Sequence, residues 1–249
     1  MAKGIVSVIG ICIAAALALQ LVDSASAGVS KQADTPPDLS GVWEHPTDFT
    51  APPPKPAVIP YVAAYQSRYQ QALKRIADGK FDLGGMCTPP GMPQILSTIG
   101  QFEILNTPGR MTILYEYQSQ VRRIWLNRSK HAPEVDVTMN GDSIGHWEGK
   151  TLVIDTAQIK DFSYLNSQGG PHSDQLHILE RLQVIGPDSL VDHVVVEDPI
   201  AFTAPWTYDV TYRRVPNGTL IDYECNENPR NPVQPDGSLG FTLEGEPTK

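Results

Sequence analysis

Histidine and carboxylate side chains indicate where this sequence of 249 residues could perform acid–base chemistry. His146 precedes Trp147 just before a predicted tight turn, and His172 lies in a Gly- and Pro-rich loop with Asp174 two residues later. Loops often hold functional groups over a cavity, and a carboxylate beside a histidine can fix its tautomer. We therefore predict His146, His172 and Asp174 as catalytic residues. The alternative for the second loop is structural capping by Ser173 and Asp174.

Glu180 carries the strongest signal among the carboxylates. Strand alternation predicts that it shares an inward face with three apolar residues, Leu176, Ile178 and Leu182. A carboxylate that faces a core must be paired, neutralised or functional, because its desolvation is costly. A raised pKa would suit a general acid or base near neutral pH. We predict Glu180 as a catalytic residue, with a structural ion pair to Arg122 or Arg123 as the alternative.

Aromatic residues on predicted strands suggest a small-molecule pocket, although the same residues also suit an ordinary β core. We predict Tyr115, Arg123 and Trp147 as substrate-binding residues, with Arg123 or a tyrosine hydroxyl holding an oxyanion. The sequence has no G-x-S-x-G elbow, phosphate loop, dinucleotide fingerprint, H-E-x-x-H or C-x-x-C motif. We therefore predict neither a cofactor nor a metal, while histidines from separate strands could still converge on one.

Composition excludes some function classes. The formal net charge of −9 disfavours binding to the phosphate backbone of nucleic acids, and 41% apolar residues disfavour intrinsic disorder. Residues 1–27 have a lysine, an apolar run and Ala25-Ser26-Ala27, which are the parts of a cleavable secretory signal. The alternative is an uncleaved membrane anchor. We predict a periplasmic or secreted protein with no membrane span after cleavage, and the oligomeric state stays unknown.

Removal of the signal would leave two cysteines, Cys87 and Cys225. In an oxidising compartment two thiols most often form a disulfide. We predict that bond, and the alternative is that Cys87 is a nucleophile beside a histidine.

The remaining chain is predicted to be one β-rich domain behind a Pro-rich arm. Residues 28–59 are rich in proline and contain one short strand over Asp38–Glu44, and apolar spacing predicts a helix over residues 60–78. After residue 100 the apolar period becomes two, in segments joined by Gly, Pro, Asn and Asp turns. The predicted pairs are 111–118 with 121–126, 146–147 with 151–155, 176–185 with 190–197, and 206–214 with 219–225. We predict an antiparallel meander closed as a barrel, with a sandwich as the alternative.

Two resemblances accompany this prediction. Gly41-Val42-Trp43 resembles the Gly-x-Trp strand of lipocalin-like (calycin) barrels, which implies a Trp packed at the barrel floor near Arg213 or Arg214. The run from Asn140 to Thr156 resembles a large, functionally uncharacterised family of secreted bacterial proteins. So do four shorter motifs: His172-Ser173-Asp174, Glu180-Arg181, Glu197-Asp198-Pro199 and Pro205-Trp206-Thr207. The second resemblance implies kinship but no activity.

Together these features predict a secreted, cofactor-free enzyme that performs lyase, isomerase or hydrolase chemistry on a small apolar or aromatic molecule in a β-barrel pocket. The alternative is a lipocalin-like carrier that binds such a molecule without transforming it. A third hypothesis is an envelope interaction module that uses the Pro-rich arm.

Overall fold

The computed structural model describes residues 1, 35–46, 58–80, 87–133 and 136–224. The chain separates into two compact units, Met1–Ala33 and Asp34–Lys249, and the second contains all the strands described below. The predicted signal peptide after its first residue, most of the Pro-rich arm and Cys225 lie outside the described residues. The signal, the arm and the Cys87–Cys225 disulfide therefore stay predictions.

Nine strands form a closed barrel, which confirms the mainly β fold and excludes the sandwich. In chain order they are β1 (Gly41–Glu44), β2 (Gln101–Thr107), β3 (Arg110–Tyr115), β4 (Val121–Trp125), β5 (Asp142–Glu148), β6 (Thr151–Ala157), β7 (His177–Gly186), β8 (Ser189–Glu197) and β9 (Trp206–Arg214). Buried residues alternate along β3, β7 and β8, so one side of each strand fills the barrel. Closure also removes the free edges that an open meander would expose.

The topology differs from the predicted antiparallel meander in two places. β4 and β5 run parallel and pair through only two residue pairs, Ile124 with Ser143 and Trp125 with Ile144. The predicted partner strand over residues 219–225 is wrong for the residues described, because β9 pairs with β1 instead, Trp43 lying opposite Arg214. The chain after β9 stays close to β1, since the Val215 N–H donates to the Val42 carbonyl at 2.9 Å.

The predicted contact between a floor tryptophan and a late arginine is confirmed. Trp43 is fully buried, and the Arg214 guanidinium carbon lies 4.1 Å from the centre of its ring. The same guanidinium donates to the Ser40 carbonyl at 2.7 Å, while Arg213 points outward to Glu44. Trp43 therefore packs at the pairing of β1 with β9, and this pairing closes the barrel.

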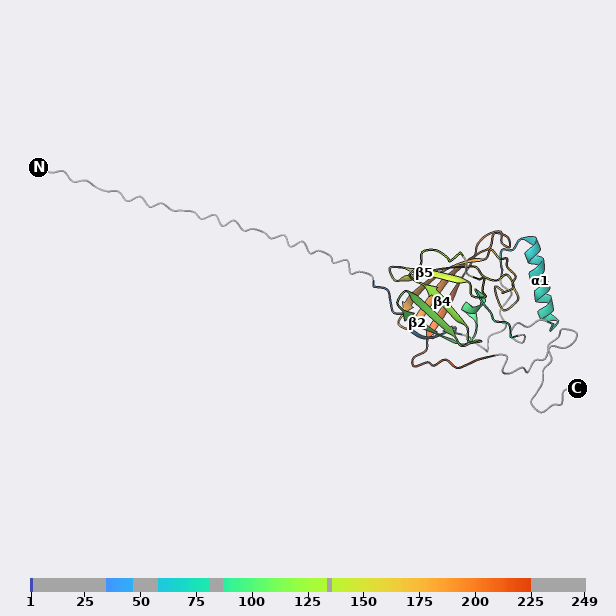
Figure 1. Ribbon diagram of the computed structural model, residues 1–249, viewed down its shortest axis with the longest axis horizontal. Helices are drawn as coiled ribbons and strands as arrows, with labels where there is room; N and C mark the ends of the chain where they lie inside the picture. Colours follow the sequence, from blue (N-terminus) through green and yellow to red (C-terminus); the bar gives the residue numbers. More distant parts are fainter. Residues whose placement is uncertain (2–34, 47–57, 81–86, 134–135, 225–249) are drawn as a thin grey trace, which may run out of the picture. The chain divides into compact units, whose positions relative to one another are not determined.

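Two helical segments accompany the strands. The predicted helix is present as α1 (Ala63–Ala77), and it ends before Gly79, whose positive φ of 67° suits the turn that follows. Figure 1 shows α1 outside the strands. A short 3-10 helix, η1 (Gln94–Ser97), was not predicted, and it carries the buried residues Ile95 and Leu96. Among the described residues, no helix combines the length and the apolar character that crossing a bilayer requires.

Candidate functional site

Glu180 lies inside the barrel, as strand alternation predicted. It is 1% exposed on β7, and the three apolar residues of its predicted face are all buried: Leu176, Ile178 and Leu182. Directly opposite it are Ile154 on β6 and Val194 on β8. A carboxylate placed between apolar neighbours in this way requires a charged or hydrogen-bonding partner.

Arg122 on β4 is that partner, so the ion pair that the sequence left open is present. Its Nη1 donates to Glu180 Oε1 at 2.9 Å, and its Nη2 donates to Glu180 Oε2. The guanidinium also donates to Ser143 at 3.2 Å and to Thr156 at 2.9 Å. These two hydroxyls lie opposite each other on β5 and β6 and bond at 2.9 Å. Burial alone would lower the pKa of Arg122, but the charge of Glu180 outweighs burial and the pKa is raised.

Asp192 on β8 is a second carboxyl group in the same interior. It is 2% exposed and bonds to the side chain of Glu180, and its Oδ1 has no hydrogen-bond partner among the described residues. Burial, followed by repulsion from Glu180, raises the pKa of Asp192 well above its ordinary value, although Arg122 opposes the shift. A neutral Asp192 that donates a hydrogen bond to the Glu180 side chain satisfies this arrangement. We call Arg122, Glu180 and Asp192 the interior charge cluster.

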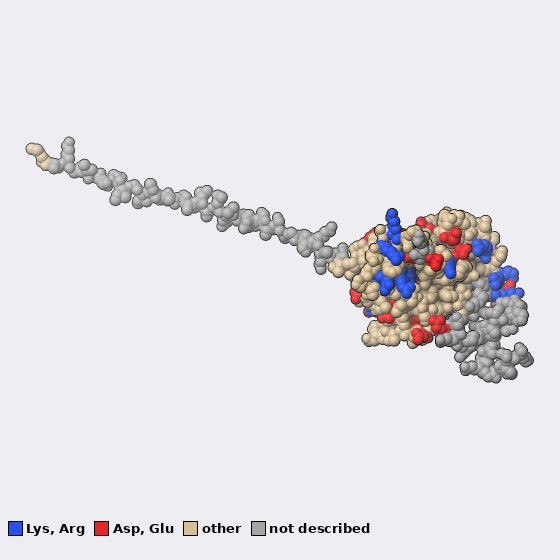
Figure 2. Space-filling view, in the orientation of Figure 1, with Lys and Arg blue, Asp and Glu red and all other residues tan. Residues whose placement is uncertain are grey.

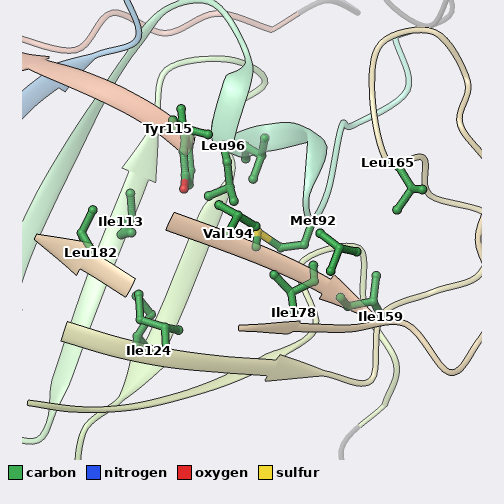
Figure 3. Close-up of a cluster of buried hydrophobic side chains, with 14 of the residues drawn as sticks. Met92, Leu96, Ile113, Tyr115, Ile124, Ile159, Leu165, Ile178, Leu182 and Val194 are labelled. Carbon is green, nitrogen blue, oxygen red and sulfur yellow. The ribbon is translucent and has the colours of Figure 1, made fainter. Parts of the chain in front are cut away.

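A small cavity adjoins the interior charge cluster. Its volume is about 10 Å³, and all three charged residues line it together with Leu96, Tyr115 and Tyr212. That volume holds about one water molecule. Leu96, Tyr115 and Tyr212 also line a second small depression on the other side, which His45 and Gly100 border. Figure 3 shows Leu96 beside Tyr115, and both residues line the cavity as well as this depression.

The tyrosines of the cavity remain neutral donors. Burial raises the pKa of both Tyr115 and Tyr212, and the nearby carboxyl groups add to the increase at Tyr212. Tyr212 donates to the Leu96 carbonyl at 2.9 Å, which ties η1 to β9. Tyr115, Arg123 and Trp147 were predicted to bind substrate. Of these three residues, Tyr115 is the one that lines the interior cavity together with Glu180.

The structure places the other predicted residues away from the interior charge cluster. His146 is exposed on β5 and contacts Glu148 at 3.3 Å. Trp147 is half-buried and packs against the edge of the apolar core. Arg123 is exposed on the outer side of β4, because alternation sends it opposite to Arg122. None of these three residues lines the interior cavity.

His172 is buried, but the expected orienting role of Asp174 is wrong. The His172 Nδ1–H donates to the Ser173 carbonyl at 2.7 Å, which leaves Nε2 to accept from the Ser163 hydroxyl at 2.7 Å. Asp174 is exposed. The capping carboxylate is Asp198 instead, which accepts from the Ser173 N–H and hydroxyl, each at 2.7 Å. The loop is therefore held by a buried hydrogen-bond network.

Burial of His172 should make stability depend on pH. Desolvation lowers its pKa below the ordinary 6.5, with the Ser173 carbonyl opposing the shift. Below pH 6.5 the unfolded chain binds a proton at His172 more readily than the folded protein does. The stability that neutral His172 contributes is therefore lost as the pH falls. We expect His172→Gln to flatten the fall in the free energy of unfolding between about pH 6.5 and pH 5, measured by urea titration. Equal pH slopes in the two proteins would contradict this.

Outside the barrel, two histidines bridge carboxylates. His131 contacts Asp142 at 3.1 Å and Asp155 at 3.0 Å, and His177 contacts Asp155 at 2.8 Å and Glu197 at 3.3 Å. Burial raises the pKa of Asp155, but hydrogen bonds from the two histidines outweigh it, and the pKa is lowered overall. In the part of the chain that is described, no group of three or more His, Cys, Asp or Glu side chains has an arrangement that would hold a metal ion.

Sequence reasoning missed Asp192, Ser143 and Thr156. Asp192 had a usable signal, because it alternates with the buried Leu190 and Val194 just as Glu180 alternates with its own neighbours. The two hydroxyl residues gave no such signal, since serine and threonine are common on either face of a strand.

Comparison with known proteins adds little to this description. No family model matches the chain, and no curated protein matches it. Among solved structures, it is similar to the fluorescent protein UnaG: one mutant of that protein has 14% identity and a TM-score of 0.33, over 72% of this chain and 97% of that one. The wild-type UnaG structure has 14% identity and a TM-score of 0.32, over 71% and 97%.

Proposed function

We propose that this protein binds a small, largely apolar molecule inside its barrel and acts on it by acid–base chemistry of the lyase, isomerase or hydrolase kind. Asp192 would be the proton donor and Glu180 its neighbour, which holds Arg122. Tyr115 would donate a hydrogen bond to the bound molecule. His146, His172 and Asp174 have no part in this step.

The observation that carries the proposal is the unpaired Oδ1 of Asp192 beside the cavity. A buried carboxyl oxygen without a partner costs free energy, so such groups are rare unless they have a function. The raised pKa of Asp192 supplies a neutral acid next to Glu180, which forms an ion pair with Arg122. A pair of carboxyl groups in different environments within one cavity is a frequent arrangement for acid and base catalysis.

The walls of the cavity indicate the class of ligand. Apolar and aromatic side chains surround the interior charge cluster on the remaining sides: Leu96, Phe102, Ile104, Ile113, Leu182 and Leu190. A ligand larger than a water molecule does not fit a cavity of about 10 Å³, so Leu96, which lines both this cavity and the outer depression, has to move. Leu96 lies on η1, which is only four residues long and would be the element that opens.

Asp192 turns its proton from Glu180 to the atom of the bound molecule that becomes negative as a bond in that molecule breaks, and a hydrogen bond from Tyr115 stabilises the developing charge. The Asp192 carboxylate then regains a proton, from a carbon of the same molecule in a lyase or isomerase step and from the attacking water in a hydrolase step. Glu180 holds Arg122 in place.

A carrier is the second function, and one observation favours it. Both oxygens of Glu180 are occupied by Arg122, which is the pattern of a structural ion pair. In a carrier, Asp192 would complete a hydrogen bond to the ligand without transferring its proton.

Native mass spectrometry of the protein purified from the cells that make it tests this proposal. We expect a native mass that exceeds the denatured mass by that of a small organic molecule. Asp192→Asn keeps the shape of the side chain, so the variant should retain the molecule but fail to convert it. Conversion by wild type alone identifies an enzyme, and conversion by neither protein identifies a carrier. Equal native and denatured masses, with no binding of the small apolar molecules screened, would refute both.

The raised pKa of Asp192 gives a further expectation. Between the ordinary value of 3.8 and the raised value, the folded protein keeps a proton that the unfolded chain releases. Stability from this group is therefore complete below the ordinary value and is lost as the pH rises through the raised one. We expect Asp192→Asn to remove this loss, so the variant should gain stability relative to wild type as the pH rises from about 4. Urea unfolding over a pH series measures the difference, and a constant difference would contradict the shift.

Secretion and the disulfide belong to the same proposal. Cleavage after Ala27 and a bond between Cys87 and Cys225 would both appear in the denatured mass, the second as a deficit of two hydrogens. A mass that still includes residues 1–27 would overturn the predicted cleavage. Free thiols at both cysteines would overturn the predicted disulfide.

A further inference from the structure

A groove on the outside of the barrel is much larger than the interior cavity. Its volume is about 500 Å³, which lies in the range of small-molecule sites. It lies along β4 and the start of β5, where the two parallel strands share only two residue pairs. We call it the β4–β5 groove. Its polar and aromatic lining includes Gln120, Arg123, Trp125, Arg128, Asn140 and Asp142.

The accessible charge of the β4–β5 groove is positive. Arg123 is exposed, and Arg128 lies 4.0 Å from the ring centre of Trp125, which fixes its position. Asp142 is the acidic residue of the lining, but its carboxylate is buried and already contacts His131 at 3.1 Å and Arg128 at 3.5 Å. Figure 2 shows Lys and Arg side chains gathered on the face that carries β4 and β5 in Figure 1. On a chain of net charge −9, such a concentration favours an anionic ligand.

Two amide side chains in the lining have unused hydrogen-bonding atoms. Gln120 Nε2 and Asn140 Oδ1 are buried, and neither has a partner among the described residues. The first is a donor and the second an acceptor. A hydroxyl group can serve both kinds of atom, since it donates one hydrogen bond and accepts others. Filling these positions would remove the cost of leaving buried polar atoms unpaired.

We propose that the β4–β5 groove binds a small oxyanion that also carries hydroxyl groups, either a hydroxylated carboxylate or a hydroxylated phosphate. Arg123 and Arg128 bind the anionic end, because a guanidinium matches the planar edge of a carboxylate or phosphate. Gln120 and Asn140 bind the hydroxyl groups. Arg122 belongs to the lining of both the groove and the interior cavity, but its guanidinium is buried against Glu180, whereas Arg123 is exposed on the other side of β4.

Isothermal titration calorimetry of the full chain tests the site with gluconate and glycerol phosphate as probes. Glucose and acetate are the controls, because glucose has hydroxyl groups without charge and acetate has charge without hydroxyl groups. We expect gluconate or glycerol phosphate to bind roughly tenfold or more tightly than either control, and the tighter of the two identifies the anion. Glucose or acetate binding equally well, or no binding by either probe, would overturn the proposal.

Matched variants separate the groove from general electrostatic attraction. Arg123→Gln should weaken binding of the tighter probe by roughly tenfold. Lys150→Gln removes the same charge from the exposed turn between β5 and β6 and should change it by less than about twofold. Asp192→Asn should leave binding unchanged, which distinguishes this groove from the interior site. Equal effects of Arg123→Gln and Lys150→Gln would overturn the proposal.

Discussion

Replacing Arg122 with Met should lower the free energy of unfolding by about 3–5 kcal/mol at neutral pH. The substitution leaves Glu180 buried without its cation, beside a second carboxyl group on Asp192. Ser143 and Thr156 also lose a donor. Urea unfolding followed by tryptophan fluorescence measures the change, and a shifted midpoint with an unchanged slope would show that stability alone is affected.

Arg181→Met is the matched control for this experiment. Arg181 follows Glu180 but faces solvent and pairs with the exposed Glu148 at 2.8 Å, so its loss should cost about 0–1 kcal/mol. Replacing both Arg122 and Glu180 with Met should recover much of the loss, because an apolar pair avoids the buried unpaired charge. Equal costs for Arg122→Met and Arg181→Met would contradict the role given to the interior ion pair.

Trp43→Ala should be the other strongly destabilising substitution, with a cost of about 3–5 kcal/mol. The indole is fully buried where β1 meets β9, and its N–H donates to the Leu39 carbonyl at 2.9 Å. Removal leaves a cavity and also takes away the ring under the Arg214 guanidinium. Since this site closes the barrel, the loss should appear as cooperative unfolding at lower urea concentration.

Trp147→Ala provides the comparison for Trp43. Trp147 is half-buried near the end of β5, so the same change should cost only about 1–2 kcal/mol. A Trp43→Ala variant no less stable than Trp147→Ala would show that the contact between Trp43 and Arg214 does not close the barrel.

The sequence was sufficient to predict which face of β7 is buried. The period of two placed Glu180 inside and Arg181 outside, and the Gly-x-Trp motif predicted the contact between Trp43 and a late arginine. Both inferences depend on local geometry, because side chains on a strand alternate whatever the strand pairs with. The same rule applied to Leu190, Asp192 and Val194 would have found the second interior carboxyl group.

Strand partners were harder to predict, since pairing depends on residues far apart in the chain. A turn at Pro216-Asn217-Gly218 suggested a hairpin, but β9 reaches Gly41–Glu44 instead. The long connection between β4 and β5 likewise allowed a parallel pair that no turn signal marks. The sequence also did not predict which side of the barrel wall His146 faces, because a residue before a turn can face either side.

The most direct measurement is the titration of the Asp192 carboxyl group by carbon-13 NMR, with Asp192→Asn used to assign its resonance. The proposed acid requires this group to keep its proton well above the ordinary pKa of 3.8, so its shift should remain that of a neutral carboxyl at pH values where carboxyl groups of ordinary pKa have ionised. Its titration should also depend on Glu180, because the two groups interact. A resonance that titrates near 3.8 would contradict the proposed acid and leave the interior charge cluster as a structural ion pair.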